Sequence, residues 1–414
     1  MNKFFVFIMS ALLLAYCTGR DQRRKITQTK NTMITDSTKL YGYNLNFLKK
    51  YVVVAELKKG KASVVVVPAW QGRVMTSTSE GPSGFSFGWI NHQLVSSGRL
   101  VPHINPFGGE ERLWLGPEGG QYAIFFKKGD EFVYDKWQTP AFLDTEPFSV
   151  IGRTDTSIVL SHEAEIENYT GTSFKLRIDR EIKLLSGNDF VKSTGIDLEG
   201  TNYVAYTSEN KLTNLGTEAW KKETGLLSIW MLGMFNPSPA VIIVIPVKQG
   251  DKKVLGVTVN DSYFGKIAPD RLKIIGSNIY FRADGKSRGK IGIPPLRAAG
   301  LMGSFDFDNN ILTLLICKLP EGKKDYVNSA WQIQDSPYSG DALNSYNDGP
   351  LADGSQMGPF YELETSSPAA ALQPGESITH SQITVHITGN RELLDKVSMK
   401  VFEVTLEDIQ KAFN

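Results

Sequence analysis

The segments TSIVLSHEAEI (156–166) and SFKLRIDREIKLL (173–185) decide the fold class, because both are long runs of strand-favouring side chains. Similar runs, separated by Gly, Pro, Asn or Asp, are YVVVAEL (51–57), SVVVVP (63–68), YAIFF (122–126), AVIIVIP (240–246), ILTLLIC (311–317) and ITHSQITVHI (378–387). Long amphipathic helical patterns do not alternate with these runs, which argues against a parallel βαβ fold. The sequence predicts an all-β protein, one large antiparallel β-sandwich with a few short peripheral helices.

Helical patterns occur at the two ends of this β-rich region. Thr38 to Tyr51 places apolar residues on one helical face, and Thr405 with Asp408 resembles a capping box before a short C-terminal helix. No internal repeat or low-complexity linker interrupts the chain after its first forty residues. We therefore expect one sandwich domain over residues 39–390 and a C-terminal extension over 391–414.

The N-terminus has the pattern of an export signal. Lys3 precedes an apolar run from Phe4 to Ala15, which is too short to span a bilayer, so residues 1–16 are predicted to be a signal peptide. Leu14-Ala15-Tyr16-Cys17 resembles a bacterial lipoprotein box with Cys17 as the lipidated first residue, although Tyr16 leaves ordinary signal cleavage open. Residues 17–38 would then be a flexible tether. These features predict a protein of the bacterial cell envelope, a periplasmic or outer-membrane lipoprotein that touches the membrane only through its lipid anchor.

Composition argues against several other classes of protein. Lys and Arg (45) nearly balance Asp and Glu (44), so no nucleic-acid partner is expected. The cysteines are Cys17 and Cys317, and Cys317 lies in the apolar run ILTLLICKL, typical of a buried inert thiol. The five histidines lack zinc-site spacing, so no metal and no cofactor is expected. The sequence carries no indication of oligomeric state.

Two short motifs favour ordinary turns over chemistry. Gly84-Phe85-Ser86-Phe87-Gly88 matches the G-x-S-x-G nucleophile elbow, but that motif needs a strand before it and a helix after it. Asp306 to Asn310 resembles the start of a calcium loop, yet Ile311 stands where the loop needs glycine. We expect a glycine-shaped loop at the first motif and a hairpin turn at the second.

The densest group of candidate binding residues lies in HINPFGGEERLWLGPEGGQ (103–121). Its glycines allow tight turns and a close approach of backbone to ligand. An indole is a flat platform for a sugar ring, and carboxylates with arginine can hydrogen-bond hydroxyl groups. The candidate residues are Glu111, Arg112, Trp114 and Glu118. The alternative is a surface loop held by a salt bridge of Arg112.

A second candidate group lies in FYELETSSPAAALQPGE (360–376) and just before it. Side chains alternate along a strand, so Glu362 and Glu364 would share one face. This pair is either part of a working site or the wet face of a strand. Asn347 and Asp348 precede it and could border the same pocket, although turn chemistry alone also explains them.

Several of these pieces, in shared order, resemble the galactose mutarotase-like superfamily. The matching segments are VVPAWQGRVMTSTSEGPSG (66–84), Phe107-Gly108-Gly109, Lys211-Leu-Thr-Asn-Leu215, Leu363-Glu364-Thr365 and Pro374-Gly375-Glu376. The resemblance covers most of residues 40–390 and is closest to a bacterial lipoprotein branch of the superfamily. It implies a large antiparallel β-supersandwich and a carbohydrate ligand.

The resemblance also implies a mechanism. In mutarotases (aldose 1-epimerases) a carboxylate removes the proton of the anomeric hydroxyl while an acid, usually His, protonates the ring oxygen. Glu364 matches the base, whereas Phe107 and Leu215 occupy the two usual histidine positions. His103 or Glu118 could replace the missing acid, since a buried carboxyl group can hold its proton.

Three hypotheses follow for the function. The first is an exported carbohydrate-active enzyme, epimerase-like, with Glu364 as general base. The second is a non-catalytic glycan-binding lipoprotein, or an accessory protein of glycoside hydrolases or lyases. The third is a structural role in the cell envelope.

Overall fold

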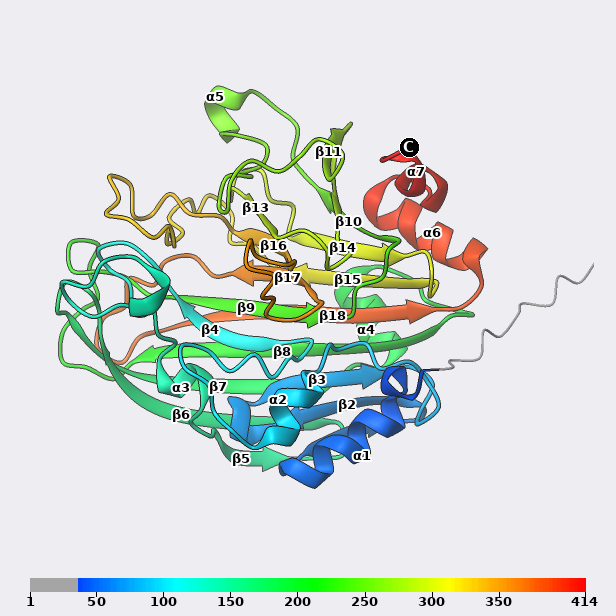
Figure 1. Ribbon diagram of the computed structural model, residues 1–414, viewed down its shortest axis with the longest axis horizontal. Coiled ribbons are helices and arrows are strands. Elements are labelled where there is room, and N and C mark those ends of the chain that lie inside the picture. Colours follow the sequence, from blue (N-terminus) through cyan, green and yellow to red (C-terminus); the bar gives the residue numbers. More distant parts are fainter. Residues whose placement is uncertain (1–35) are drawn as a thin grey trace, which may run out of the picture. The chain divides into compact units, whose positions relative to one another are not determined.

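The computed structural model describes residues 36–414, in which the strands form three antiparallel sheets (Figure 1). The first sheet is a meander of β1 (Ala55–Lys59), β2 (Ala62–Val67) and β3 (Arg73–Thr78). Helix α1 (Tyr41–Tyr51) packs on it through Tyr41, Leu45 and Leu48. A 3-10 turn at Ser37–Lys39 precedes this helix, and a second one, Pro68–Trp70, follows β2.

The second sheet contains ten strands in the order β11-β12-β10-β14-β15-β18-β8-β7-β6-β5. A bulge at Ile151 interrupts the pairing of the edge strand β5 with β6. Their bounds are β5 Ser149–Arg153, β6 Ser157–Glu167, β7 Ser173–Leu184, β8 Asn202–Asn214, β10 Val241–Pro246, β11 Leu272–Ile275, β12 Asn278–Arg282, β14 Leu301–Asp306, β15 Ile311–Cys317 and β18 Ser377–Thr388.

The third sheet has five strands in the order β13-β16-β17-β9-β4. They are β4 Arg112–Gly116, β9 Ser228–Phe235, β13 Gly289–Ile293, β16 Leu343–Asn347 and β17 Tyr361–Ser366. One face of this sheet packs on the ten-stranded sheet, because Leu363 and Ile291 share a buried cluster with Ile243 and Leu315. Residues next to Leu363 along β17 must therefore face away from the ten-stranded sheet.

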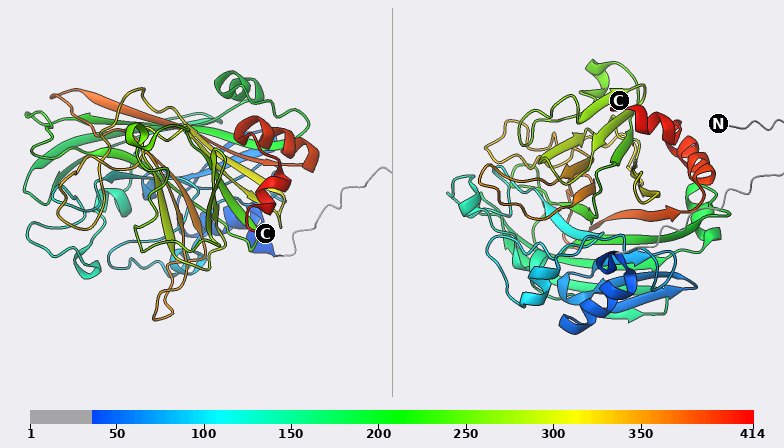
Figure 2. Two further views of the ribbon diagram at one scale, coloured as in Figure 1. Left: turned by 90° about the horizontal axis from the view of Figure 1, so that it is seen from above. Right: turned by 45° about the vertical axis from the view of Figure 1, so that its right-hand side comes forward.

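The opposite face of the ten-stranded sheet is covered by helices. α4 (Gly187–Thr194), α6 (Arg391–Phe402) and α7 (Leu406–Lys411) bury apolar side chains against it, and Figure 2 shows the two C-terminal helices at this face. The other helices are short: α2 His92–Ser97, η3 Tyr134–Lys136, α3 Ala141–Asp144 and α5 Lys252–Leu255. None of the helices within residues 36–414 has the length and apolar character of a membrane-spanning helix.

The predicted all-β class and its antiparallel sandwich are confirmed. The capping box of Thr405 and Asp408 begins α7, and a turn at residues 307–310 joins β14 to β15, both as predicted. The predicted strand 51–57 begins later, at Ala55, because α1 continues to Tyr51. The signal peptide, most of the tether and Cys17 lie outside the described residues.

The predicted strand YAIFF (122–126) is wrong. This segment is an irregular loop whose apolar side chains are buried in the core. The amide of Ala123 donates to the Gly120 carbonyl and that of Ile124 to the Pro117 carbonyl, so local turns satisfy the backbone. A short apolar run indicates burial, and it cannot by itself distinguish a strand from a buried loop.

Candidate functional site

The outer face of the five-stranded sheet, the one turned away from the ten-stranded sheet, carries a row of polar side chains. Strand pairing aligns Gly292 of β13, Asn344 of β16, Glu364 of β17 and Leu232 of β9 with Arg112 of β4. A neighbouring row aligns Lys290, Tyr346, Glu362 and Met234. We call this group the outer-face site.

Glu364 lies at the centre of the outer-face site and is fully buried. Lys290 Nζ lies 3.0 Å from Glu364 Oε1 and 2.9 Å from Oε2, and Trp230 Nε1 donates to Oε2 at 2.9 Å. The ammonium group of Lys290 also lies 4.7 Å from the ring centre of Trp230. One charged and one neutral donor therefore hold the carboxylate of Glu364 in place.

Glu362 shares this face with Glu364, as strand alternation predicts. Its Oε1 accepts a 2.7 Å hydrogen bond from Arg112 Nη2, and both side chains are almost fully buried. The guanidinium of Arg112 stacks 4.4 Å over the ring of Trp114, which meets Trp230 edge to face. Burial, together with the charge of Glu364, raises the pKa of Glu362 to about 7. The wet-strand alternative is wrong for this pair, since Glu362 and Glu364 are 4% and 0% exposed.

Glu118 lies beside the site, just after β4. Burial raises the pKa of Glu118 to about 6, the charge of Glu364 adds to this rise, and Lys290 opposes it. Its backbone amide donates to Ser329 Oγ, and an added Cβ on Gly119 would lie only 2.4 Å from the Ala330 carbonyl oxygen. The segment after β4 therefore packs closely on residues 329–330, which fixes where Glu118 enters the site.

A second covering segment carries Tyr263 over the β13 side of the site. The hydroxyl of Tyr263 donates to Asp341 Oδ2 and accepts from Asn344 Nδ2 at 3.2 Å. Lys290 Nζ lies 5.8 Å from the ring centre of Tyr263. Burial raises the pKa of Asp341 to about 6, although Tyr263 and Asn260 bond to its ionised form. Aromatic and acidic side chains thus surround Lys290 and Glu364.

His103 is held outside this group of charges. Its Nδ1 lies 2.6 Å from the Trp137 carbonyl oxygen, and its ring packs against Tyr134 at 4.6 Å. Because a carbonyl only accepts, Nδ1 must carry the proton. Phe107 stacks on Trp70 at 4.2 Å, and Leu215 follows the end of β8.

Glu111 points the opposite way from Arg112, into the space between the two large sheets. It forms an ion pair with Arg180 of β7, in which both side chains are fully buried. Ser208 Oγ at 2.9 Å and Gln382 Nε2 at 2.7 Å donate to its other oxygen. The structure thus separates Glu111 from the predicted ligands Arg112 and Trp114 by one strand layer.

Asn347 and Asp348 hold turns at the end of β16. Asn347 Nδ2 donates to the Ser287 carbonyl at 2.8 Å, and Asn347 Oδ1 accepts from the Gly285 amide at 2.9 Å. Asp348 accepts from the hydroxyl of Tyr346 at 2.6 Å and from the Gly358 amide at 3.0 Å. Their polar groups are committed to the fold, and only Tyr346 links them to the outer-face site.

Sequence reasoning missed Lys290, Trp230, Tyr263 and Asp341. Lys290 stands between glycines in the segment RGKIGIP, where its neighbours give no sign of a carboxylate partner. Its position opposite Tyr346 follows only from strand pairing between distant parts of the chain. Sequence patterns of single strands contain no information on such pairing.

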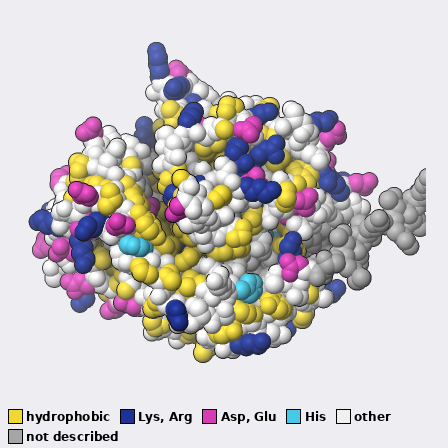
Figure 3. All heavy atoms as spheres, in the orientation of Figure 1, with side chains coloured by type: hydrophobic (Ala, Val, Ile, Leu, Met, Phe, Trp, Pro, Cys, Tyr) yellow, Lys and Arg dark blue, Asp and Glu magenta, His cyan; other side chains and the backbone are white. Residues whose placement is uncertain are grey.

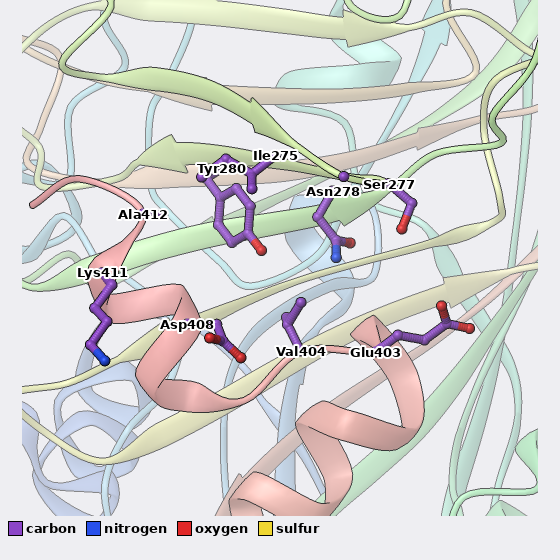
Figure 4. Close-up of a pocket in the computed structure, with 10 residues that line it drawn as sticks. Ile275, Ser277, Asn278, Tyr280, Glu403, Val404, Asp408, Lys411 and Ala412 are labelled. Carbon is purple, nitrogen blue, oxygen red and sulfur yellow. The ribbon is translucent and has the colours of Figure 1, made fainter.

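One cavity elsewhere on the described surface is lined by polar groups that already have structural partners. This cavity of about 430 Å³ lies between the β11–β12 turn and the C-terminal helices (Figure 4). Its Asp408 caps α7, and Asn278 donates to the Phe402 carbonyl, so these groups serve the fold. The face in Figure 3 carries acidic and basic side chains interspersed, in keeping with a net charge of +1.

The sandwich and its outer-face site define an all-β protein with a buried cluster of carboxylates and cations on a sheet face. Residues 39–413 match the profile of a family described as "Family of unknown function (DUF6786)", and the chain belongs to this family. No curated protein matches its sequence.

The solved structures that resemble this chain include galactose mutarotase-like proteins. A galactose mutarotase-like protein from Lactobacillus casei is 11% identical, with a TM-score of 0.48 over 81% of this chain and 100% of that one. The Slr1438 protein from Synechocystis is 13% identical, with a TM-score of 0.49 over 82% and 96%. A proposed aldose 1-epimerase from Escherichia coli K12 is 14% identical, with a TM-score of 0.46 over 82% and 99%.

Proposed function

We propose that the protein is an exported, carbohydrate-active protein whose outer-face site binds a sugar and catalyses epimerase-like proton transfer. The observation that carries this proposal is the grouping of Glu118, Glu362 and Glu364 with Arg112 and Lys290 beside indole rings. When their environments give two carboxyl groups different pKa values, one can act as the acid and the other as the base at the same pH. Indole rings supply platforms for the apolar face of a sugar.

In the proposed reaction Glu364 is the base and Glu118 is the acid. Glu364 removes the proton from the anomeric hydroxyl while Glu118 donates a proton to the ring oxygen, and the bond between the anomeric carbon and the ring oxygen breaks. Rotation of the open-chain aldehyde and the reverse transfers then close the ring as the other anomer. Both carboxyl groups return to their starting states, so no cofactor is consumed. Lys290 and Trp230, which bond Glu364 in the free protein, must yield one oxygen to the sugar.

The test is mutarotation of freshly dissolved α-D-galactose and α-D-glucose, followed by polarimetry. Glu364→Gln is expected to lower the catalysed rate at least about 100-fold, the usual contribution of a positioned acid or base. Glu163→Gln, on an exposed position of β6, is the matched control and should retain the wild-type rate. Wild-type rates in a folded Glu364→Gln protein would contradict the proposal.

A specific observation favours a second candidate, a non-catalytic glycan-binding protein. Both oxygens of Glu364 already accept hydrogen bonds from Lys290 or Trp230, as expected of a carboxylate that serves as a fixed acceptor in a binding site. This candidate predicts calorimetric binding of a glycan without any change of the sugar after long incubation. Reproducible conversion of a bound sugar would exclude it.

Export and the lipid anchor are a separate part of the proposal, supported by the sequence of residues 1–17. Metabolic labelling with a radioactive fatty acid should mark the wild-type protein. Cys17→Ala should abolish this label, and a label that persists would contradict lipidation at Cys17.

A further inference from the structure

We infer that the outer-face site selects a sugar that carries a free amino group, a hexosamine, over neutral and acidic sugars. This inference rests on the proposed sugar site and deepens it by naming the class of sugar. Three features of the site favour an amino sugar: a carboxyl group without a salt bridge, buried donors without a partner, and the position of Asp341.

The cations of the site are already paired. Arg112 bonds to Glu362 at 2.7 Å, and Lys290 bonds to both oxygens of Glu364. Glu118 and Asp341 form no salt bridge with any residue of the described range. Since Glu118 holds its proton as the proposed acid, Asp341 is the carboxylate that remains without a salt bridge beside a cluster whose other charges are paired. A ligand carboxylate or phosphate would meet like charge here, whereas an ammonium group would compensate it.

Asp341 is placed to receive this ammonium group. An added Cβ on Gly292 would lie 1.9 Å from Asp341 Oδ2, so the carboxyl group rests directly on β13. Gly292 pairs with Asn344, which pairs with Glu364, so two strand spacings, roughly 10 Å, separate the β13 and β17 backbones. Tyr263 and Asn260 both bond to Oδ2, which leaves Oδ1 for a ligand.

A metal ion fits these carboxyl groups poorly. Among residues 36–414 no three His, Cys, Asp or Glu side chains are grouped closely enough to hold one ion. Glu362 and Glu364 instead lie on β17, and Glu118 and Asp341 lie in two separate loops, which suits a ligand that carries its charge on one arm of a larger polar body.

Independent support comes from buried donors that have no partner. Among the described residues, Arg112 Nε and Trp114 Nε1 are buried without an acceptor, and both side chains are more than nine-tenths buried. Arg112 touches Glu362 directly, so this donor belongs to the site. An unpartnered buried donor is costly, and a sugar hydroxyl is a suitable acceptor. The site thus offers acceptors for an ammonium group and donors for hydroxyl groups.

The test compares four sugars on the full chain by isothermal titration calorimetry at pH 7, where the amine of the sugar is still largely protonated and Asp341, with a pKa of about 6, is ionised. D-glucosamine is expected to bind at least about tenfold more tightly than D-glucose or N-acetyl-D-glucosamine, because a compensated charge near a protein surface contributes at least this factor. D-glucuronate should bind most weakly. Equal or tighter binding of D-glucose would overturn the inference and leave the proposed function standing. Failure of all four sugars to bind would overturn the proposed sugar site and the inference with it.

A matched pair of variants tests the role of Asp341. Asp341→Asn should lower the ratio of D-glucosamine to D-glucose affinity about tenfold. Asp335→Asn, an exposed position of the same loop, should keep the wild-type ratio. An unchanged ratio in Asp341→Asn that still binds D-glucose would overturn the assignment. If Asp341→Asn fails to fold, the four-sugar comparison on the wild-type protein still decides the inference.

Discussion

The buried ion pair between Arg180 and Glu111 gives the sharpest prediction on stability. Replacing Arg180 by Met removes the charge and keeps an extended side chain of similar reach. Glu111 then stays fully buried with only the donors of Ser208 and Gln382. Removing one partner of a buried pair costs about 3–5 kcal/mol, since the remaining charge is uncompensated. We expect this loss of unfolding free energy at pH 8.

The loss should shrink at acid pH. Burial already raises the pKa of Glu111 above its usual value of 4.5, and Arg180→Met removes the charge that opposes this rise. A carboxyl group whose pKa is higher in the folded than in the unfolded protein destabilises the fold at pH values above the folded-state pKa. At pH values below the unfolded-state pKa it is protonated in both states and has no effect on stability. The difference between variant and wild type should therefore decrease as the pH falls toward 4.5.

The assay is urea unfolding followed by tryptophan fluorescence at several pH values. Arg177→Met is the matched control. The side chains of Arg177 and its partner Asp179 are 37% and 26% exposed, and a pair this exposed contributes less than about 1 kcal/mol. Arg180→Met combined with Glu111→Gln should regain part of the loss, since the amide no longer carries a buried charge. A cost below about 1 kcal/mol for Arg180→Met, or no recovery in the double variant, would refute the reasoning. Glu111→Gln should also leave sugar affinity unchanged in the folded protein.

Three further predictions concern single side chains. Burial raises the pKa of Glu362 to about 7, so the free energy of unfolding should fall by roughly 3 kcal/mol between pH 4.5 and 7. Glu362→Gln should remove this pH-dependent loss, which urea unfolding at each pH would measure. Trp114→Ala should weaken glycan binding about tenfold in calorimetry, because an aromatic platform contributes about 1 kcal/mol or more, and unchanged affinity would exclude the stacking role. Thr405→Ala should cost about 1 kcal/mol of stability, because it removes the capping box with Asp408. Ser355→Ala is the control and should cost much less in the same denaturation assay, because the Ser355 hydroxyl bonds only to the exposed Asp353.

Strand content was the most predictable part of the fold. Long alternating or apolar runs such as 173–185 and 311–317 contain enough residues for the pattern to be unambiguous. The short run 122–126 failed because five apolar residues can be buried by a strand or by a loop. The sequence pattern did not predict β9, because this strand contains tryptophan, methionine and glycine and few β-branched residues.

The candidate site was predictable only within single strands. Alternation correctly placed Glu362 and Glu364 on one face, since that inference needs no knowledge of neighbours. The same alternation places Glu111 and Arg112 on opposite sides of the chain. Which of these two residues points into the interior depends on how β4 packs, which alternation alone does not determine. Lys290 reaches Glu364 through strand pairing, and Asp341 reaches Tyr263 through loop packing, in both cases across distant segments that no local pattern relates.

The bulge at Ile151 has a consequence for how the protein behaves at high local concentration. The ten-stranded sheet ends at β5, where Val150 and Ile151 are exposed. An exposed apolar edge strand of this kind is a site for pairing with a strand of a second molecule. Because the bulge breaks the regular spacing of the backbone groups, an incoming strand cannot continue the hydrogen-bond ladder along this edge. At the other edge β11 has only four residues and includes Lys273, which limits any ladder there. The sheet can thus be very wide without becoming a seed for fibrils.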